Sequence, residues 1–189
     1  MNQFDASYRR LFGTRAIVRD LLCLPWIKPL TQTLNLQTLE PLPTDLISRQ
    51  HDDRQVDLLW QTQAQDGHST YVQVQIEHQS RPERDMALRM LTYRGLLYES
   101  FRRGQRHRGQ LPALIPIVLY SGTRPWRAAL QVRELIAPVD KVLEPYQPTL
   151  KYFLIDQRQL VHDPKLQNMA ELPENLAWLQ FRLEHSSGA

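Results

Sequence analysis

Glycine, cysteine and long apolar runs are scarce in this 189-residue sequence, and each scarcity excludes a class of protein. The seven glycines are scattered, so neither the glycine-rich dinucleotide fingerprint nor the P-loop motif is present, and we expect no nucleotide cofactor. The single cysteine, Cys23, cannot form an internal disulfide or a multi-cysteine zinc site. Its leucine neighbours predict a buried thiol.

The longest apolar run covers residues 111–120 and is interrupted by Pro112 and Pro116. It is shorter than the ~20 residues that a membrane helix needs, so we expect no membrane association. The first residues show no secretory signal, which makes the cytoplasm the expected compartment. The length predicts a single domain over residues 1–189. The net charge of +3 permits nucleic-acid binding without establishing it.

Hydrophobic periodicity predicts alternating helices and strands, and therefore an α/β protein. Apolar residues at helical spacing predict one or two helices over 5–24, with a break at Gly13. The proline-rich segment 25–43 reads as a connector over the core. Alternation over 56–63 and 69–79, with Asp66-Gly67 between them, predicts a β-hairpin.

The second half of the chain continues the same pattern. Apolar residues spaced by three or four predict a helix from Met86 to Phe101 that ends near Gly104. The segment 114–120 reads as a buried strand. A helix over 126–136, a strand over 151–155 and a short helix over 173–183 complete the prediction.

Two carboxylates in the hairpin are candidates for chemistry. Asp57 lies in a strand, where an unpaired carboxylate is costly to bury, and Glu77 lies at the end of the partner strand with Gln79 on the same face. Two carboxylates brought together favour a hard divalent cation such as Mg²⁺, which can activate water for attack on a phosphodiester. A plainer alternative is that both are strand-end carboxylates paired with Arg54 or Arg89.

The geometry of the hairpin makes a definite demand. For Asp57 to lie directly opposite Glu77, the numbers of paired residues must add up to 134, as with a three-residue loop 66–68 or a five-residue loop 65–69. A two-residue turn at Asp66-Gly67 would place Asp57 opposite Ile76 instead.

Four sequence blocks in order resemble the Rpn family of recombination-promoting nucleases, also catalogued as YhgA-like transposases. They are residues 4–12 (FDASYRRLF), 56–60 (VDLLW) with 75–80 (QIEHQS), 86–89 (MALR) and 114–122 (LIPIVLYSG). The resemblance implies a restriction-endonuclease-like PD-(D/E)XK fold, a mixed β-sheet flanked by helices, that cuts DNA with Mg²⁺, for which Mn²⁺ could substitute. It also implies a role in recombination or mobile-element biology.

The resemblance assigns roles to individual residues. Asp57 and Glu77 would be the metal ligands, and Gln79 would take the place of the lysine in the E-x-K signature, with Asp5 as a weaker additional acid. Because a neutral amide carries no positive charge, Arg84 or Arg89 would supply it. Arg106 and Arg108 are further candidates for DNA contacts, whereas Arg102 and Arg103 could equally complement the dipole of their helix.

Two alternatives to a cleaving enzyme stay open. One is an inactive member of the same fold that binds DNA or a protein, which the amide at Gln79 would allow. The other is a transposase, for which the sequence shows no separate DNA-recognition module. Family members usually extend further, so a C-terminal part could be missing, and a homodimer is compatible with the sequence.

Overall fold

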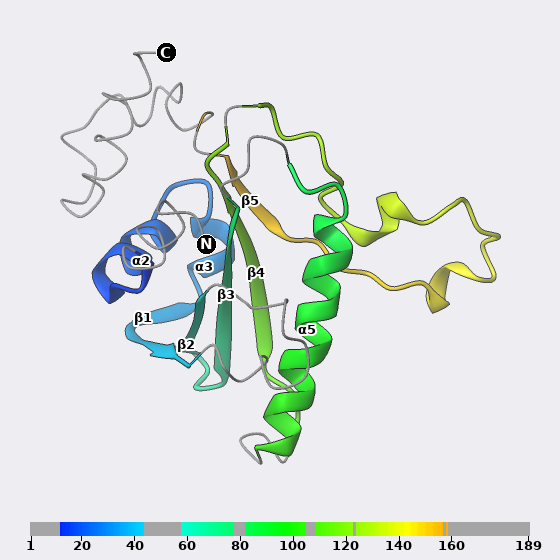
Figure 1. Cartoon of the computed structure of the whole chain (residues 1–189). Helices are drawn as coiled ribbons and strands as arrows, with labels where there is room; N and C mark the ends of the chain where they lie inside the picture. The colour runs from blue at the N-terminus through cyan, green and yellow to red at the C-terminus, as the bar shows by residue number, and fades with distance from the viewer. Residues whose placement is uncertain are drawn as a thin grey trace.

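A five-stranded mixed sheet forms the centre of the computed structural model, which describes residues 12–43, 58–77, 82–104, 109–122, 124–156 and 158, with only the backbone for 74–77. The strands lie in the order β1 (Leu34–Leu42), β2 (Leu58–Ala64), β3 (Ser69–Glu77), β4 (Ala113–Tyr120), β5 (Phe153–Asp156). The first three strands pair antiparallel, while β3, β4 and β5 run parallel (Figure 1). The expected mixed α/β sheet is therefore confirmed.

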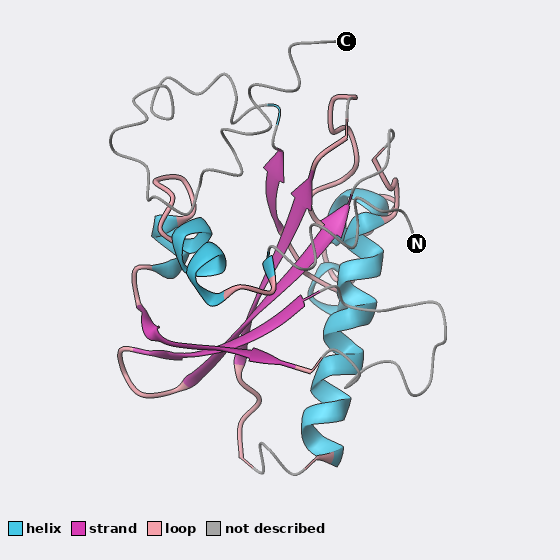
Figure 2. Cartoon of the chain, turned by 60° about the vertical axis from the view of Figure 1, so that its left-hand side comes forward, coloured by secondary structure: helices cyan, strands magenta, loops and turns pink. Residues whose placement is uncertain are grey.

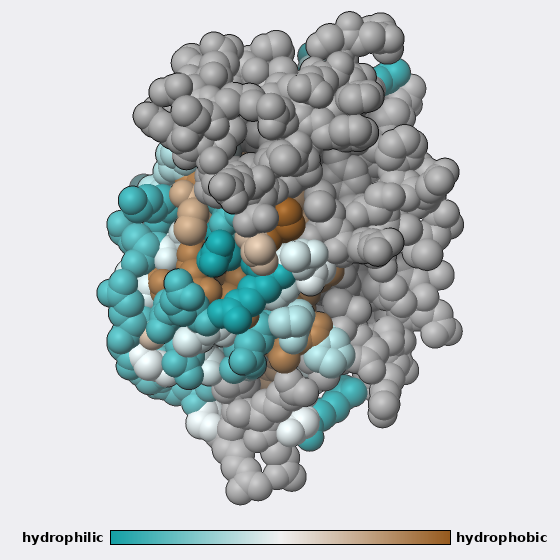
Figure 3. Space-filling model, turned by 90° about the vertical axis from the view of Figure 1, so that its left-hand side faces the viewer, coloured by the Kyte–Doolittle hydropathy of each residue, from teal (hydrophilic) through white to brown (hydrophobic). Residues whose placement is uncertain are grey.

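Helices cover both faces of this sheet (Figures 1 and 2). The helices α2 (Arg15–Leu22) and α3 (Lys28–Thr31) lie on one side, and α5 (Met86–Arg103) lies on the other. Alternate residues of each strand therefore enter different cores: Trp60 and Val72 pack with the α2 side, while Leu59 and Tyr71 pack with α5. On the side of α2 and β1, hydrophilic side chains dominate the described surface, with apolar areas between them (Figure 3).

The hairpin of β2 and β3 is confirmed, but its register differs from the one that the direct pairing of Asp57 with Glu77 requires. Leu58 pairs with Val74 and Gln63 with Ser69, so paired numbers add up to 132 rather than 134. The loop is odd in length as expected, but it is centred one residue earlier: the Ala64 N–H donates to the His68 carbonyl at 2.8 Å. Gly67 adopts φ of 84°, a left-handed conformation that glycine reaches without strain.

The predicted helix over 86–101 is confirmed as α5, which ends at Gly104. Its inner face buries residues at three- and four-residue spacing: Met86, Met90, Tyr93, Leu97 and Phe101. These side chains cover the α5 side of the sheet together with the inward residues of β2, β3 and β4. The helix also makes the crossover between parallel strands β3 and β4, which a parallel pair requires.

Three expectations are wrong. The segment 25–43 is not only a connector, because it contains α3 and the edge strand β1. The pairing of β1 with β2 shifts between Asn35 and Glu40, and this bulge interrupts the alternation of side chains by which a strand is recognised in a sequence. The segment 126–136 forms only a 3-10 turn, η1 (Val132–Leu135). Cys23 is exposed rather than buried, because it caps the end of α2.

The break predicted at Gly13 lies just before α2, and the strand predicted at 151–155 is β5. The helix predicted over 173–183 lies outside the described residues. Within the described ranges, no helix has the length and hydropathy to cross a membrane.

Candidate functional site

The structure describes only part of the predicted site. Glu77 is the last residue of β3, where its backbone pairs with Tyr120 of β4. Asp57 and Gln79 lie outside the described residues. So do Asp5, Arg54, Arg106 and Arg108. The placement of the site must therefore be argued from the backbone of β3 and from its neighbours.

The end of β3 belongs to a row of residues across the sheet. Glu77 pairs with Tyr120, and Tyr120 pairs with Asp156, the last residue of β5. These residues mark the carboxyl ends of three parallel strands. In open α/β sheets this edge is where ligands bind, because loops leave the sheet there and polar groups converge.

Asp156 is a buried carboxylate in this row, and it is not among the residues predicted from the sequence. Its side chain is only 1% exposed. One oxygen, Oδ1, accepts a hydrogen bond from the Arg158 backbone N–H at 3.0 Å and lies 3.6 Å from the Arg158 Nε. The other, Oδ2, is buried and has no hydrogen-bond partner within the described part of the chain. The signal available in the sequence was an acid directly after the apolar strand predicted to end at Ile155.

Gln73 is a second polar group inside the α5 side of the sheet. Its side chain is fully buried. Its Nε2 contacts the Met90 sulfur at 3.9 Å, and its Oε1 has no hydrogen-bond partner among the residues described. These contacts do not replace the hydrogen bonds with water that the Gln73 amide loses on burial.

Two of the predicted DNA-contacting arginines are described. Arg84 is exposed in the turn that precedes α5. Arg89 is half-buried on the first turns of α5, where its Nε donates to the Tyr93 hydroxyl at 2.8 Å and its guanidinium lies 5.5 Å from the Tyr93 ring centre. This end of α5 lies at the same end of the sheet as the C-terminus of β3 (Figure 1). Both arginines therefore belong to the same side of the molecule as Glu77.

Aromatic side chains pack around Tyr120, the middle residue of this row. The Tyr120 hydroxyl donates to the Arg124 carbonyl at 2.8 Å, and its ring packs edge-on against Trp126 with centroids 4.9 Å apart. The Trp126 Nε1 donates to the Tyr152 hydroxyl at 3.1 Å, which in turn donates to the Ala129 carbonyl at 2.8 Å. Burial raises the pKa of Tyr152 above its ordinary value.

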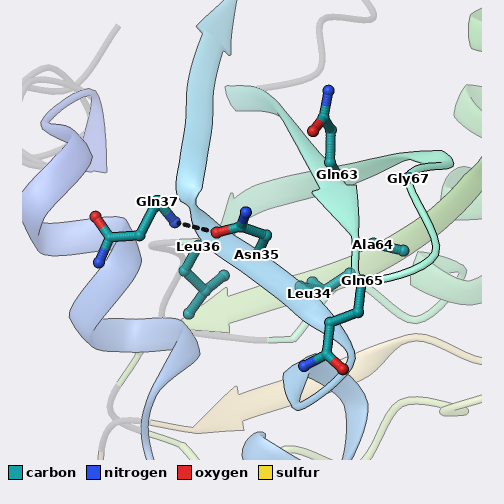
Figure 4. A pocket seen from close by; sticks show the side chains of 8 residues that line it. All are labelled: Leu34, Asn35, Leu36, Gln37, Gln63, Ala64, Gln65 and Gly67. Atoms are coloured by element: carbon teal, nitrogen blue, oxygen red, sulfur yellow. Dashed lines mark hydrogen bonds between the residues drawn. The ribbon is translucent and has the colours of Figure 1, made fainter.

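A hollow of about 540 Å³ lies at the opposite end of the sheet, between β1 and the turn that joins β2 to β3 (Figure 4). Neutral amides line it, among them Asn35, Gln37 and Gln63. Because β3 rises ~3.3 Å per residue, this end lies roughly 26 Å from Glu77. Among the side chains described, no three or more His, Cys, Asp or Glu residues cluster in a way that could hold a metal ion.

The architecture and the carboxylates at the parallel edge define an α/β protein with a candidate site at the carboxyl end of its sheet. Comparison with known families gives the particular class: residues 2–178 match the family described as "Putative transposase, YhgA-like". The chain therefore belongs to this family, the Rpn and YhgA-like group that the sequence blocks resemble.

Curated relatives carry the names of nucleases. The chain is 32% identical to the "Inactive recombination-promoting nuclease-like protein RpnE" of Escherichia coli K12, over 67% of this chain and 42% of that protein. It is 30% identical to the "Recombination-promoting nuclease RpnC" of the same strain, over 62% of this chain and 38% of that protein. It is 29% identical to the "Recombination-promoting nuclease RpnD" of Escherichia coli O157:H7, over 65% and 47%.

The chain thus spans less than half the length of the curated relatives it matches. No solved structure matches it significantly.

Proposed function

We propose that this chain is a divalent-cation-dependent DNA endonuclease of the PD-(D/E)XK type, with its site at the carboxyl end of β3. The observation that carries the proposal is the position of Glu77 at this edge, in a register row with the buried Asp156. The names of RpnC and RpnD support a nuclease. RpnE, named as inactive, supports the alternative that the chain binds DNA without cutting it.

The register of the hairpin bears on how the two predicted ligands meet. Leu58 pairs with Val74 at the end of the described register. If the pairing of β2 with β3 continued by one more residue, Asp57 would lie opposite Gln75 and diagonal to Glu77. Odd-numbered residues of both strands then share one face, and diagonal neighbours lie ~7–8 Å apart. That separation lets two carboxylate side chains approach a common ion.

The residue types at this edge fit a divalent cation. Mg²⁺ takes oxygen ligands and is usually held by one or two carboxylates plus water, which Asp57 and Glu77 would provide. Asp156, whose Oδ2 has no hydrogen-bond partner among the described residues, is a further carboxylate at the same edge. When bound, Mg²⁺ would supply positive charge to the phosphate and lower the pKa of a bound water.

Other residues of the chain would bind and orient the DNA. Arg84, exposed before α5, would contact a phosphate and provide the positive charge that Gln79 lacks. Arg89, fixed by Tyr93, would hold a second phosphate in a defined place.

The test is nicking of supercoiled plasmid by the purified chain with Mg²⁺, Mn²⁺ or EDTA. Asp57→Asn and Glu77→Gln should each reduce nicking by at least about 100-fold, on the order of the loss of an electrostatic group that stabilises the transition state. Glu40→Gln, the same change at an exposed carboxylate of β1, is the matched control and should nick like the wild type.

The outcomes separate the two candidates. Cutting that requires the metal and both carboxylates supports the nuclease. Plasmid binding in a gel-shift assay without any nicking would support the inactive DNA-binding alternative instead. Nicking that survives both substitutions would contradict the assigned site.

A further inference from the structure

An arm formed by residues 133–149 projects from the body of the molecule between β4 and β5 (Figure 1). Its base is fixed. The Val132 N–H donates to the Leu150 carbonyl at 2.9 Å and the Tyr152 N–H donates to the Leu130 carbonyl at 3.2 Å. Val132 and Leu150 are both buried in the α5 core. The base of the arm is therefore anchored to the domain. Beyond the base, the conformation of the arm depends on contacts within the arm.

The tip of the arm carries apolar side chains that nothing in the described chain covers. Val142 is 73% exposed, Leu143 50% and Tyr146 79%. Val142 and Leu143 precede the 3-10 turn η2 (Glu144–Tyr146), and Tyr146 is its last residue. An exposed tyrosine beside aliphatic side chains is typical of an anchor in a protein interface.

Internal contacts hold the tip in shape. The Leu143 N–H donates to the Asp140 carbonyl at 2.9 Å, and the Tyr146 N–H donates to the Leu143 carbonyl at 3.1 Å. An ion pair of 3.7 Å between Arg133 and Glu144 ties the tip back to the start of the arm. A preorganised tip loses little conformational entropy on binding, which favours association.

A surface that suits the apolar arm tip lies on the outer face of α5. It is a hollow of about 370 Å³ lined by Gly95, Tyr98, Glu99, Arg102, Arg103 and Leu111. We call it the α5 hollow. Its lining surface is mainly apolar, and Leu111 is itself 39% exposed.

Gly95 is the residue that points to a partner. It lies in the interior of an 18-residue helix, where glycine is less favourable than any residue except proline. A Cβ built on Gly95 would have no atom of the described residues within 4 Å beyond the backbone of its own helix, so packing among these residues does not require glycine there. A glycine that internal packing does not explain leaves room for a side chain that approaches from outside.

Charge favours a second copy as the occupant. The rim of the hollow has one net positive charge, because Arg102 and Arg103 outnumber Glu99, which pairs with Arg103 at 2.9 Å. The tip segment 140–146 has one net negative charge, because Asp140 and Glu144 outnumber Lys141. We propose that the arm tip of one copy docks in the α5 hollow of a second copy, so that two reciprocal contacts form a two-fold symmetric dimer. This inference does not depend on the proposed nuclease activity.

The experiment measures the mass of the full chain in solution by light scattering after gel filtration, up to about 100 µM, where a dimer of micromolar affinity is fully formed. The wild type should be a dimer. Tyr146→Glu puts a charge in the arm tip, and Gly95→Gln fills the hollow without an internal clash; each should give a monomer. Unchanged circular dichroism, and a Tm for Gly95→Gln that is not lowered, would show that both variants fold.

Mixing the two monomeric variants gives the decisive result. Tyr146→Glu retains an intact hollow and Gly95→Gln retains an intact arm, so a mixed pair keeps one of the two contacts. The mixture should therefore recover a dimer that neither variant forms alone. Exposed Leu88, on the same outer face, offers a matched control because Leu88→Gln should leave the dimer unchanged.

Two results would overturn the proposal. The first is a wild type that stays monomeric throughout the concentration range. If Gly95→Gln then weakens DNA binding, the hollow contacts nucleic acid and not a second copy. The second is a dimer that persists in both variants, or a mixture that fails to associate.

Discussion

Replacing Gln73 by methionine tests whether the buried amide on β3 weakens the fold. Gln73 is fully buried against α5, where its nitrogen has only a sulfur contact at 3.9 Å and its oxygen has no partner among the described residues. Methionine has a similar length and no strong polar group, and it fills irregular gaps in a core. The change removes a desolvation penalty without opening a cavity.

The size of the effect follows from the environment of the side chain. An amide buried without compensating hydrogen bonds costs ~1–3 kcal/mol in proteins. The weak contact with Met90 offsets a small part of this, and imperfect packing offsets some more. We expect Gln73→Met to raise the free energy of unfolding by about 1.5 kcal/mol, which for a chain of this size is a rise of roughly 4 °C in Tm.

The assay is urea denaturation followed by circular dichroism, with a thermal scan as a second measure. Gln63→Met is the matched control, because Gln63 is an exposed amide on the neighbouring strand; its effect should stay within about 0.5 kcal/mol. If Gln73→Met leaves the stability unchanged or lowers it, the amide is satisfied in solution and the reasoning from its missing partner is refuted.

Two further predictions concern titrating groups. Because burial raises the pKa of Tyr152 in the folded state, the stability that it contributes is present below its unfolded pKa of ~10 and falls as the pH rises above it. The free energy of unfolding, measured by urea denaturation, should be lower at pH 11 than at pH 9. Tyr152→Phe should make this decrease smaller by on the order of 1 kcal/mol. The same decrease in the variant and the wild type would contradict the raised pKa of Tyr152. Partial burial, followed by the charge of Asp20, raises the pKa of Cys23. A disulfide reagent at pH 8 should therefore label this exposed thiol more slowly than a free cysteine, and Asp20→Asn should accelerate labelling; an unchanged rate would contradict the role of Asp20.

The parts of the fold that the sequence predicts well are those where one local pattern decides the structure. In α5, apolar residues at helical spacing and Gly104 at the end agree, and the structure follows both. In the hairpin, alternation and Asp66-Gly67 agree in the same way. Where local signals agree in this way, the secondary structure of a segment can be predicted without its tertiary contacts.

The failures occur where tertiary pairing overrides the local pattern. β1 contains Pro41 and a bulge between Asn35 and Glu40, and its strand is established only by pairing with β2, including a hydroxyl contact of 3.2 Å between Thr38 and Thr62. The segment 126–136 has helical spacing, but its apolar residues pack individually: Trp126 on Tyr120, and Val132 in the α5 core. Spacing alone does not distinguish these cases.

The residue types of the candidate site come from the sequence and stay a prediction, because Asp57 and Gln79 lie outside the described residues. The register of the hairpin could not be predicted from the sequence, because a shift of the loop centre by one residue moves the position opposite every residue by two. Asp156 was missed because its relation to Glu77 passes through Tyr120 and exists only once β3, β4 and β5 lie side by side. No spacing along the chain shows that two residues lie in the same row of the sheet with another strand between them.

At four positions, packing within the fold does not explain the type of residue that is present. Gln73 and Asp156 hold buried oxygens that have no hydrogen-bond partner in the described part of the chain, Gly95 weakens the middle of a helix, and Tyr146 exposes an aromatic ring to water. Each choice lowers stability or solubility relative to an obvious replacement, so stability cannot be the reason for its presence. Where sequence and fold conflict in this way, function is the usual cause. Asp156 lies at the edge proposed for catalysis, while Gly95 and Tyr146 belong to the two surfaces proposed to meet between copies. Cleavage and association can therefore be tested by separate substitutions in the same chain.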